Sequence, residues 1–180
     1  MKLKRVFGVG IAIGLMAPIG VLTSVPAGAA TIVTCAKPSG VVTFSPGLGT
    51  TKKIQTTSFS LPVKNCKGGG VTSGTSKGST KGTKPQNCAS FASDPSASTT
   101  QVTITWNTKK TSTAKLATKV SGAPDGSLIA TVSGKISKGL FLGKTIKTKV
   151  KVTLQKGAIC TDQNPLKKAT LTGLSALTIG

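Results

Sequence analysis

The sequence predicts an all-β fold, an antiparallel two-sheet sandwich of about eight strands, with a small barrel as the alternative. Two observations predict it. Apolar and polar residues alternate with a period of two in several segments, and clusters of Gly, Pro, Asn and Ser separate these segments at short intervals. Short strands joined by such turns are typical of sandwiches and barrels.

The clearest alternation covers residues 144–155. One set of alternate positions carries β-branched and aliphatic side chains, which suit a buried face: Ile146, Thr148, Val150, Val152 and Leu154. Lys147, Lys149 and Lys151 occupy the positions between them. Same-face residues of a strand stand roughly 6.6–6.8 Å apart, so these lysines should form a row of charges on a solvated face.

Weaker alternations predict the other elements, at residues 31–35, 41–44, 53–63, 101–106, 113–120, 127–136 and 168–179. Pro62 lacks a backbone N–H and places its segment at an edge or a strand end. The Gly-, Ser- and Thr-rich residues 67–84 predict an exposed edge strand, whose Lys77, Lys81 and Lys84 would discourage pairing with other chains. A single helical turn is expected within residues 87–93.

Residues 1–30 have the pattern of a cleaved export signal. Lys2, Lys4 and Arg5 precede an apolar run, and small residues end it at Ala27-Gly28-Ala29-Ala30. The remainder, residues 31–180, is expected to form one domain, monomeric and without a transmembrane segment. We expect the protein to be secreted or associated with the cell envelope.

Four cysteines follow the signal segment: Cys35, Cys66, Cys88 and Cys160. An even number in an exported chain predicts two disulfides, and four cysteines allow three pairings. The favoured pairing is Cys35–Cys66 with Cys88–Cys160. A metal site is the weaker interpretation, because the chain has no C-x2-C pair and no histidine.

The composition argues against catalysis and predicts neither a metal nor a cofactor. The chain has no His, and its three acids, Asp94, Asp125 and Asp162, stand beside turn-forming residues. Ser112 and Lys115 match the S-x-x-K pattern of serine penicillin-binding enzymes, but they lie in a β alternation and the partner motifs are missing. The sequence therefore favours a non-enzymatic protein.

The formal net charge of +21, with 24 basic and three acidic residues, favours anionic partners. Specific nucleic-acid recognition is not expected, because the predicted domain has neither Arg nor many aromatic residues for stacking. The leading hypothesis is electrostatic association with an anionic envelope polymer or lipid surface through Lys147, Lys149, Lys151, Lys77, Lys81 and Lys84. The alternative without a binding partner is that the lysines keep the domain soluble and monomeric.

An apolar segment between two glycines, Leu140-Phe141-Leu142, has two interpretations. It plugs one end of the fold, or it is a tip that contacts lipid or a partner. The alternative function is carriage of an apolar ligand between the two sheets, reached past these three residues.

Several short motifs also carry a resemblance: Cys35, Val42–Leu48, Asn65-Cys66, Asn87–Ser90, Ile104–Trp106, Gly139–Thr145 and the final Leu-Thr-Ile-Gly. Together with the export signal, they resemble a group of small exported β-proteins of actinomycete bacteria. The resemblance covers most of the predicted domain and implies a β-rich secreted protein. It implies no activity and assigns no functional residues.

Overall fold

The computed structural model describes residues 32–93, 98–123, 127–154 and 160–180. The predicted signal segment, Asp94 and Asp125 lie outside these residues. The described chain contains one short helix, α1 (Cys88–Ser93), and ten strands: β1 (Val33–Cys35), β2 (Ser39–Leu48), β3 (Thr56–Val63), β4 (Gly74–Lys81), β5 (Ser98–Trp106), β6 (Thr111–Gly122), β7 (Leu128–Gly139), β8 (Thr145–Leu154), β9 (Leu166–Gly173) and β10 (Leu177–Ile179).

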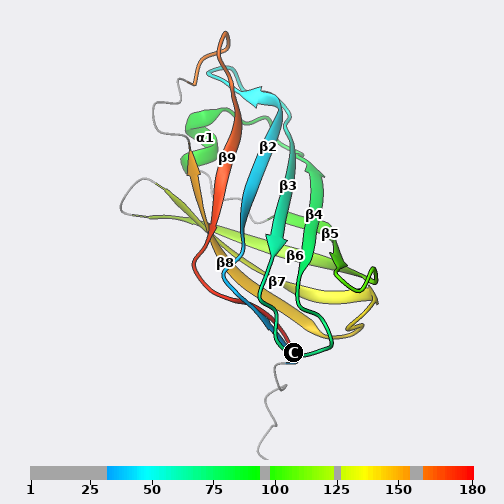
Figure 1. Cartoon of the computed structure of the whole chain (residues 1–180). Coiled ribbons are helices and arrows are strands. Elements are labelled where there is room, and N and C mark those ends of the chain that lie inside the picture. The colour runs from blue at the N-terminus through cyan, green and yellow to red at the C-terminus, as the bar shows by residue number, and fades with distance from the viewer. Residues whose placement is uncertain (1–31, 94–97, 124–126, 155–159) are drawn as a thin grey trace, which may run out of the picture.

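Eight of these strands form a closed antiparallel barrel. Each strand from β2 to β8 pairs with the next in sequence, and β9 completes the circle by pairing with both β2 and β8. In Figure 1, β9, β2, β3 and β4 run nearly upright, while β5–β8 cross them at a steep angle. The all-β prediction is confirmed, and the barrel fits the alternative given with it. The sandwich is not confirmed.

β8 pairs with two different strands along one of its edges. Its first residues pair with β10, through Ile146↔Ile179, and its later residues pair with β9, through Val152↔Leu171. Between β9 and β10 the chain stays close to β8, because the backbone N–H groups of Leu174 and Ser175 both donate to the Lys149 carbonyl. β1 then extends the sheet by pairing with β10.

Two adjoining hydrophobic clusters fill the barrel. The first surrounds Trp106 and contains the Cys35 and Cys66 side chains, and the second surrounds Phe44 and Leu48. Phe59 packs against both. The alternation predicted for residues 144–155 is confirmed over β8, where the inward positions are buried or half-buried, Lys147 and Lys149 are exposed and Lys151 is half-buried; Gln155 lies outside the described residues.

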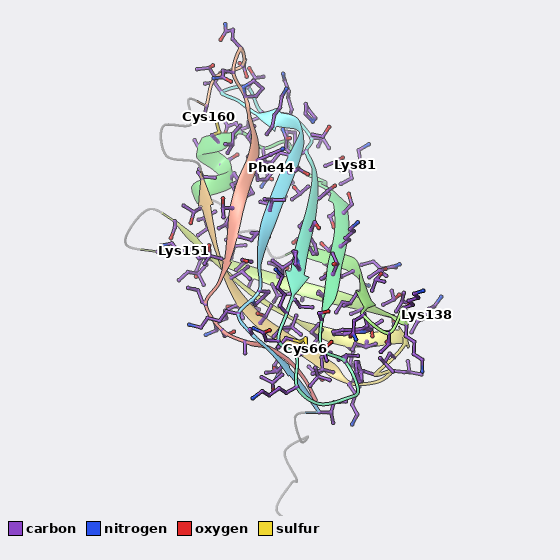
Figure 2. The ribbon with its side chains drawn as sticks, in the orientation of Figure 1. Phe44, Cys66, Lys81, Lys138, Lys151 and Cys160 are labelled. Carbon is purple, nitrogen blue, oxygen red and sulfur yellow. A yellow bond between two sulfur atoms is a disulfide. The ribbon has the colours of Figure 1, made fainter. Side chains whose placement is uncertain are left out.

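The predicted cysteine pairing is confirmed. One disulfide joins Cys35 to Cys66 and the other joins Cys88 to Cys160, closing loops of 31 and 72 residues. Figure 2 shows Cys66 and Cys160 at opposite ends of the barrel. The second disulfide holds α1 beside the second cluster, where Phe91 meets Phe44 edge to face with ring centroids 5.1 Å apart.

The expected helical turn is present as α1, and Asn87 caps it. The Asn87 side-chain oxygen accepts the Ser90 N–H at 2.9 Å, and the Ser90 hydroxyl accepts the Asn87 N–H at 2.9 Å. This reciprocal arrangement satisfies backbone donors that the first turn of a helix leaves unpaired.

The prediction of an exposed edge strand in residues 67–84 is wrong. β4 pairs with β3 along its whole length and with β5 over residues 74–78, so it lies inside the closed sheet. Its small residues have a packing role that composition did not reveal: a Cβ on Gly78 would lie 2.6 Å from the Phe59 ring, and Ser76 is 4% exposed. Lys77 therefore guards no open edge, and Lys81 and Lys84 lie beyond the residues of β4 that pair with β5.

Candidate functional site

Every lysine in the described residues is exposed except Lys151, which is half-buried. The lysines that the sequence singled out do not share one face. Lys147, Lys149 and Lys151 lie on β8, and Lys77 and Lys81 lie on β4, four strands away around the closed barrel in either direction. Lys84 follows the end of β4. Figure 2 shows Lys151 and Lys81 on opposite sides of the molecule.

The lysines of β8 lie beside lysines of β6 and β7 rather than beside those of β4. We call six lysines of these three strands the lysine face: Lys115, Lys119, Lys135, Lys147, Lys149 and Lys151. The strand register places them together, because Lys149 lies opposite Thr131, which lies opposite Lys119. Lys135 lies opposite Thr145, so Lys147 is its diagonal neighbour, at roughly 7–8 Å.

Lys115 and Lys135 are directly opposite each other on β6 and β7. Directly opposed residues have Cβ atoms roughly 4.5–5.5 Å apart, and like charges at this distance are destabilising. The described residues of β5–β8 include no carboxylate that could compensate them. The lysine face is therefore a concentration of positive charge with no carboxylate among the described residues of these strands.

The remaining outward residues of these strands are mainly hydroxyl-bearing, such as Thr131, Ser133 and Thr145. The aromatic residues of the described chain lie in the interior or pack against it; Trp106, for example, is 2% exposed. The lysine face thus offers ammonium and hydroxyl groups and no stacking surface. Lysine is a compact point charge, which suits diffuse contact with anionic groups.

Asp162 is the only acidic residue among the described residues, and its hydrogen-bond partners are distant from it in the sequence. Its carboxylate accepts hydrogen bonds from the hydroxyls of Thr50 at 2.7 Å and Thr51 at 2.6 Å and from the Thr51 N–H at 3.0 Å. The Thr51 hydroxyl, followed by the other two donors, lowers the Asp162 pKa to about 2. Asp162 therefore ties the segment after Cys160 to the loop between β2 and β3.

The segment Leu140-Phe141-Leu142 divides between core and solvent. Leu140 and Phe141 are half-buried and pack against the first cluster, and Phe141 meets Trp106 edge to face at 5.6 Å. Leu142 is 64% exposed.

Ser112 and Lys115, the S-x-x-K pair, point to opposite sides of β6. Ser112 is fully buried, accepts the Trp106 indole N–H at 2.8 Å and donates to the Leu140 carbonyl at 2.5 Å. Lys115 is exposed on the outer surface. The structure thus gives Ser112 a packing role and does not bring the two side chains together.

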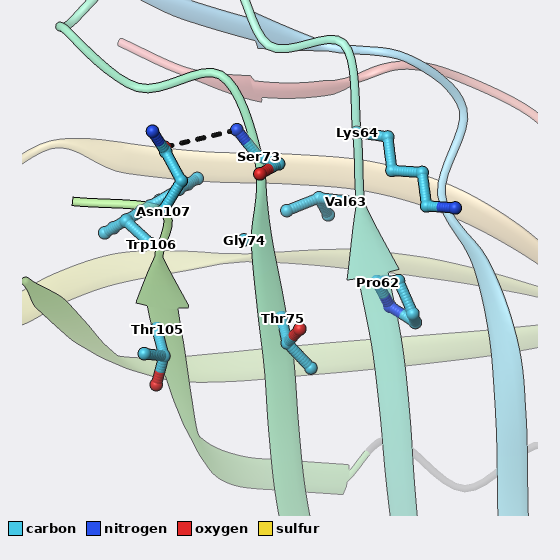
Figure 3. A pocket seen from close by; sticks show the side chains of 9 residues that line it. All are labelled: Pro62, Val63, Lys64, Ser73, Gly74, Thr75, Thr105, Trp106 and Asn107. Atoms are coloured by element: carbon cyan, nitrogen blue, oxygen red, sulfur yellow. Dashed lines mark hydrogen bonds between the residues drawn. The ribbon is translucent and has the colours of Figure 1, made fainter. Parts of the chain in front are cut away.

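A groove of about 350 Å³ lies where β3 and β5 end and β4 begins (Figure 3). Its lining includes Pro62, Val63, Gly74, Trp106 and Asn107. The Asn107 side-chain oxygen accepts the N–H groups of Thr72 and Ser73, which fixes the rim. None of Leu140, Phe141 and Leu142 lines this groove, so it is not the passage expected for an apolar ligand.

Among the described residues, no group of three His, Cys, Asp or Glu side chains is placed to hold a metal ion. The described part of the chain also contains no helix with the length and apolar character of a membrane span.

Fold and surface together define a small, disulfide-bonded, closed β-barrel with a cationic outer face. No protein-family model, curated protein or solved structure matches the chain. The resemblance to exported actinomycete β-proteins accordingly stays a prediction.

Proposed function

We propose that this protein is an exported, non-enzymatic β-barrel that binds a linear anionic polymer of the cell envelope through the lysine face. The observation that carries the proposal is the direct opposition of Lys115 and Lys135 within a group of lysines that has no carboxylate on the same strands. A lysine surface serving solubility alone gains nothing from placing like charges opposite each other. A bound polyanion would offset that repulsion.

Phosphodiester polymers suit the chemistry of this face better than bases or aromatic ligands do. Phosphate groups accept hydrogen bonds from lysine and threonine, and they need no stacking partner. Lys147 and Lys149 stand roughly 6.6–6.8 Å apart along β8, and adjacent strands add steps of roughly 4.8 Å, so a flexible chain can reach several ammonium groups at once. Such binding is expected to weaken with salt as charges are screened.

The proposal is tested by a quadruple variant of the lysine face: Lys115→Gln, Lys135→Gln, Lys147→Gln and Lys149→Gln. The matched control removes the same charge elsewhere: Lys52→Gln, Lys77→Gln, Lys81→Gln and Lys84→Gln. Binding to fluorescent poly(glycerol phosphate) is measured by anisotropy across a salt series. We expect the face variant to lose most of its affinity and its salt dependence, and the control to keep both. Equal losses in the two variants would refute a localised site and leave only net charge.

A further inference from the structure

Leu142 is the most exposed large hydrophobic residue in the described part of the chain. Its side chain is 64% exposed, compared with 44% for Val41, 41% for Leu174 and 36% for Ile54. It stands near the middle of the turn between β7 and β8. An isolated exposed leucine is unremarkable in itself. The backbone and the charges around this one set it apart.

The turn holds Leu142 outward by a fixed backbone conformation. Gly139 and Gly143 adopt positive φ values of 82° and 80°, and between them Phe141 also has a positive φ, 65°. For a bulky residue this left-handed conformation costs roughly 1–2 kcal/mol, which the packing of Phe141 on Trp106 offsets. With Phe141 turned into the barrel, Leu142 faces solvent.

Hydrogen bonds close the turn at its base. The Gly143 N–H donates to the Ile136 carbonyl at 2.8 Å, and the Lys144 N–H donates to the Phe141 carbonyl at 3.1 Å. The Leu142 side chain is therefore carried on an ordered support rather than on a loose loop, so little ordering entropy would be lost if it were inserted into an apolar phase.

Four lysines lie in or next to the two neighbouring turns at this end of the barrel. Lys138 and Lys144 flank the turn, and Figure 2 shows Lys138 at the rim of the barrel. Lys109 and Lys110 belong to the neighbouring β5–β6 turn, which lies beside Leu140 because the Leu140 N–H donates to the Thr111 carbonyl at 2.8 Å. All four lysines are exposed, and neither turn contains a carboxylate.

We propose that this end of the barrel, defined by Leu142 with Lys109, Lys110, Lys138 and Lys144, docks on an anionic lipid bilayer. Leu142 enters the boundary between head groups and acyl chains, and the four ammonium groups contact lipid phosphates. An apolar side chain bracketed by lysines is the combination that interfacial anchoring uses, because burial and attraction to anionic lipid act together. The contact is reversible and separate from the lysine face, which takes polymer.

The test uses vesicles of equal parts phosphatidylglycerol and phosphatidylcholine, with pure phosphatidylcholine vesicles as the uncharged comparison. Leu142→Ser should weaken sedimentation with the anionic vesicles about tenfold, the loss expected when one leucine no longer enters lipid. Ile54→Ser, an exposed aliphatic residue in the loop between β2 and β3, is the matched control and should bind as the wild type does. Pure phosphatidylcholine should retain little of any variant.

A fluorescence measurement reports insertion directly. Leu142→Trp should give a blue shift with the anionic vesicles, whereas Ile54→Trp should give none. Unchanged binding by Leu142→Ser, or no shift from Leu142→Trp, would overturn the proposal.

The two proposals fail separately. Leu142→Ser should bind poly(glycerol phosphate) like the wild type, and the quadruple lysine-face variant should lose no more vesicle binding than its charge-matched control. Vesicle binding lost only in the lysine-face variant would show that lipid is held by that face and would overturn the docking role of Leu142.

Discussion

Lys115 and Lys135 face each other across the β6–β7 ladder, so two positive charges stand at a position where neighbouring strands commonly pair opposite charges. The substitution Lys135→Glu should convert this repulsion into an attraction. We expect the free energy of unfolding to rise by about 0.5 kcal/mol, a modest gain because both side chains are exposed. Urea denaturation at low salt measures it.

Polymer binding should respond to the same substitution in the opposite direction. Lys135→Glu removes one ammonium group from the lysine face and adds a carboxylate beside Lys115 and Lys147. A variant that is more stable and yet binds poly(glycerol phosphate) more weakly would show that the pair serves binding. Lys77→Glu on β4 is the control for charge. Loss of stability in Lys135→Glu would contradict the repulsion argument.

The Trp106 indole N–H donates a hydrogen bond to the Ser112 hydroxyl, and both residues are buried. Ser112→Ala removes two hydrogen bonds, one from the Trp106 indole N–H to the Ser112 hydroxyl and one from that hydroxyl to the Leu140 carbonyl. The expected loss is about 1–3 kcal/mol of unfolding free energy, because unsatisfied buried polar groups keep their desolvation cost. Thermal unfolding followed by tryptophan fluorescence measures it. Ser121→Ala, exposed on the same strand, should be nearly neutral.

Asp162 should make stability depend on pH in the acid range. Its pKa is about 2 in the folded protein, against an ordinary value of 3.8, so the unfolded chain binds the proton more tightly. The stabilisation is therefore present above pH 3.8 and is lost as pH falls towards 2. Asp162→Asn should be less stable than the wild type near neutral pH, and the difference should shrink below pH 3.8. Urea unfolding at a series of pH values checks this, and a constant difference would contradict it.

The two disulfides should differ in their access to reductant. Cys35 and Cys66 are 1% and 7% exposed, whereas Cys88 and Cys160 are both half-buried. Mild thiol treatment of the folded protein should therefore open Cys88–Cys160 first, as measured by alkylation and peptide mapping. The double variant Cys88→Ser with Cys160→Ser should lose about 4 kcal/mol in the chain-entropy model, given its 72-residue loop. Simultaneous opening of both bonds would contradict the order predicted from burial.

Local patterning predicted the parts of the fold that depend on one strand at a time. Within residues 144–155 the alternation is strict, so it predicts which positions of β8, Thr145–Leu154, face the interior. The favoured cysteine pairing, Cys35–Cys66 with Cys88–Cys160, is also confirmed. Closure of the sheet could not be read in the same way, because the pairing of β9 with both β2 and β8 joins segments far apart in the chain.

Glycines contribute to that closure without leaving a periodic signal. A Cβ on Gly134 would collide with the Lys115 carbonyl oxygen, and one on Gly40 would collide with the Ser60 carbonyl oxygen. Bare backbone at these places lets neighbouring strands approach closely, as barrel corners require. The lysine face could be predicted only in part. The alternation in β8 indicates Lys147 and Lys149, but the β6–β7 and β7–β8 registers are needed to place Lys115 and Lys135 beside them.

The pairing of β1 with β10 gives the barrel an unequal response to mechanical load. Val33 lies opposite Ile179, and the Ile32 N–H donates to the Ile179 carbonyl, so a pull on these neighbouring ends would peel the two strands apart one bond at a time. Such peeling needs little force, yet the Cys35–Cys66 bond would arrest it after three residues of β1. Tension from the N-terminal side would then pass through the disulfide into the β3–β4 loop and bypass β2 and β3, the two strands that lie between these cysteines in the chain.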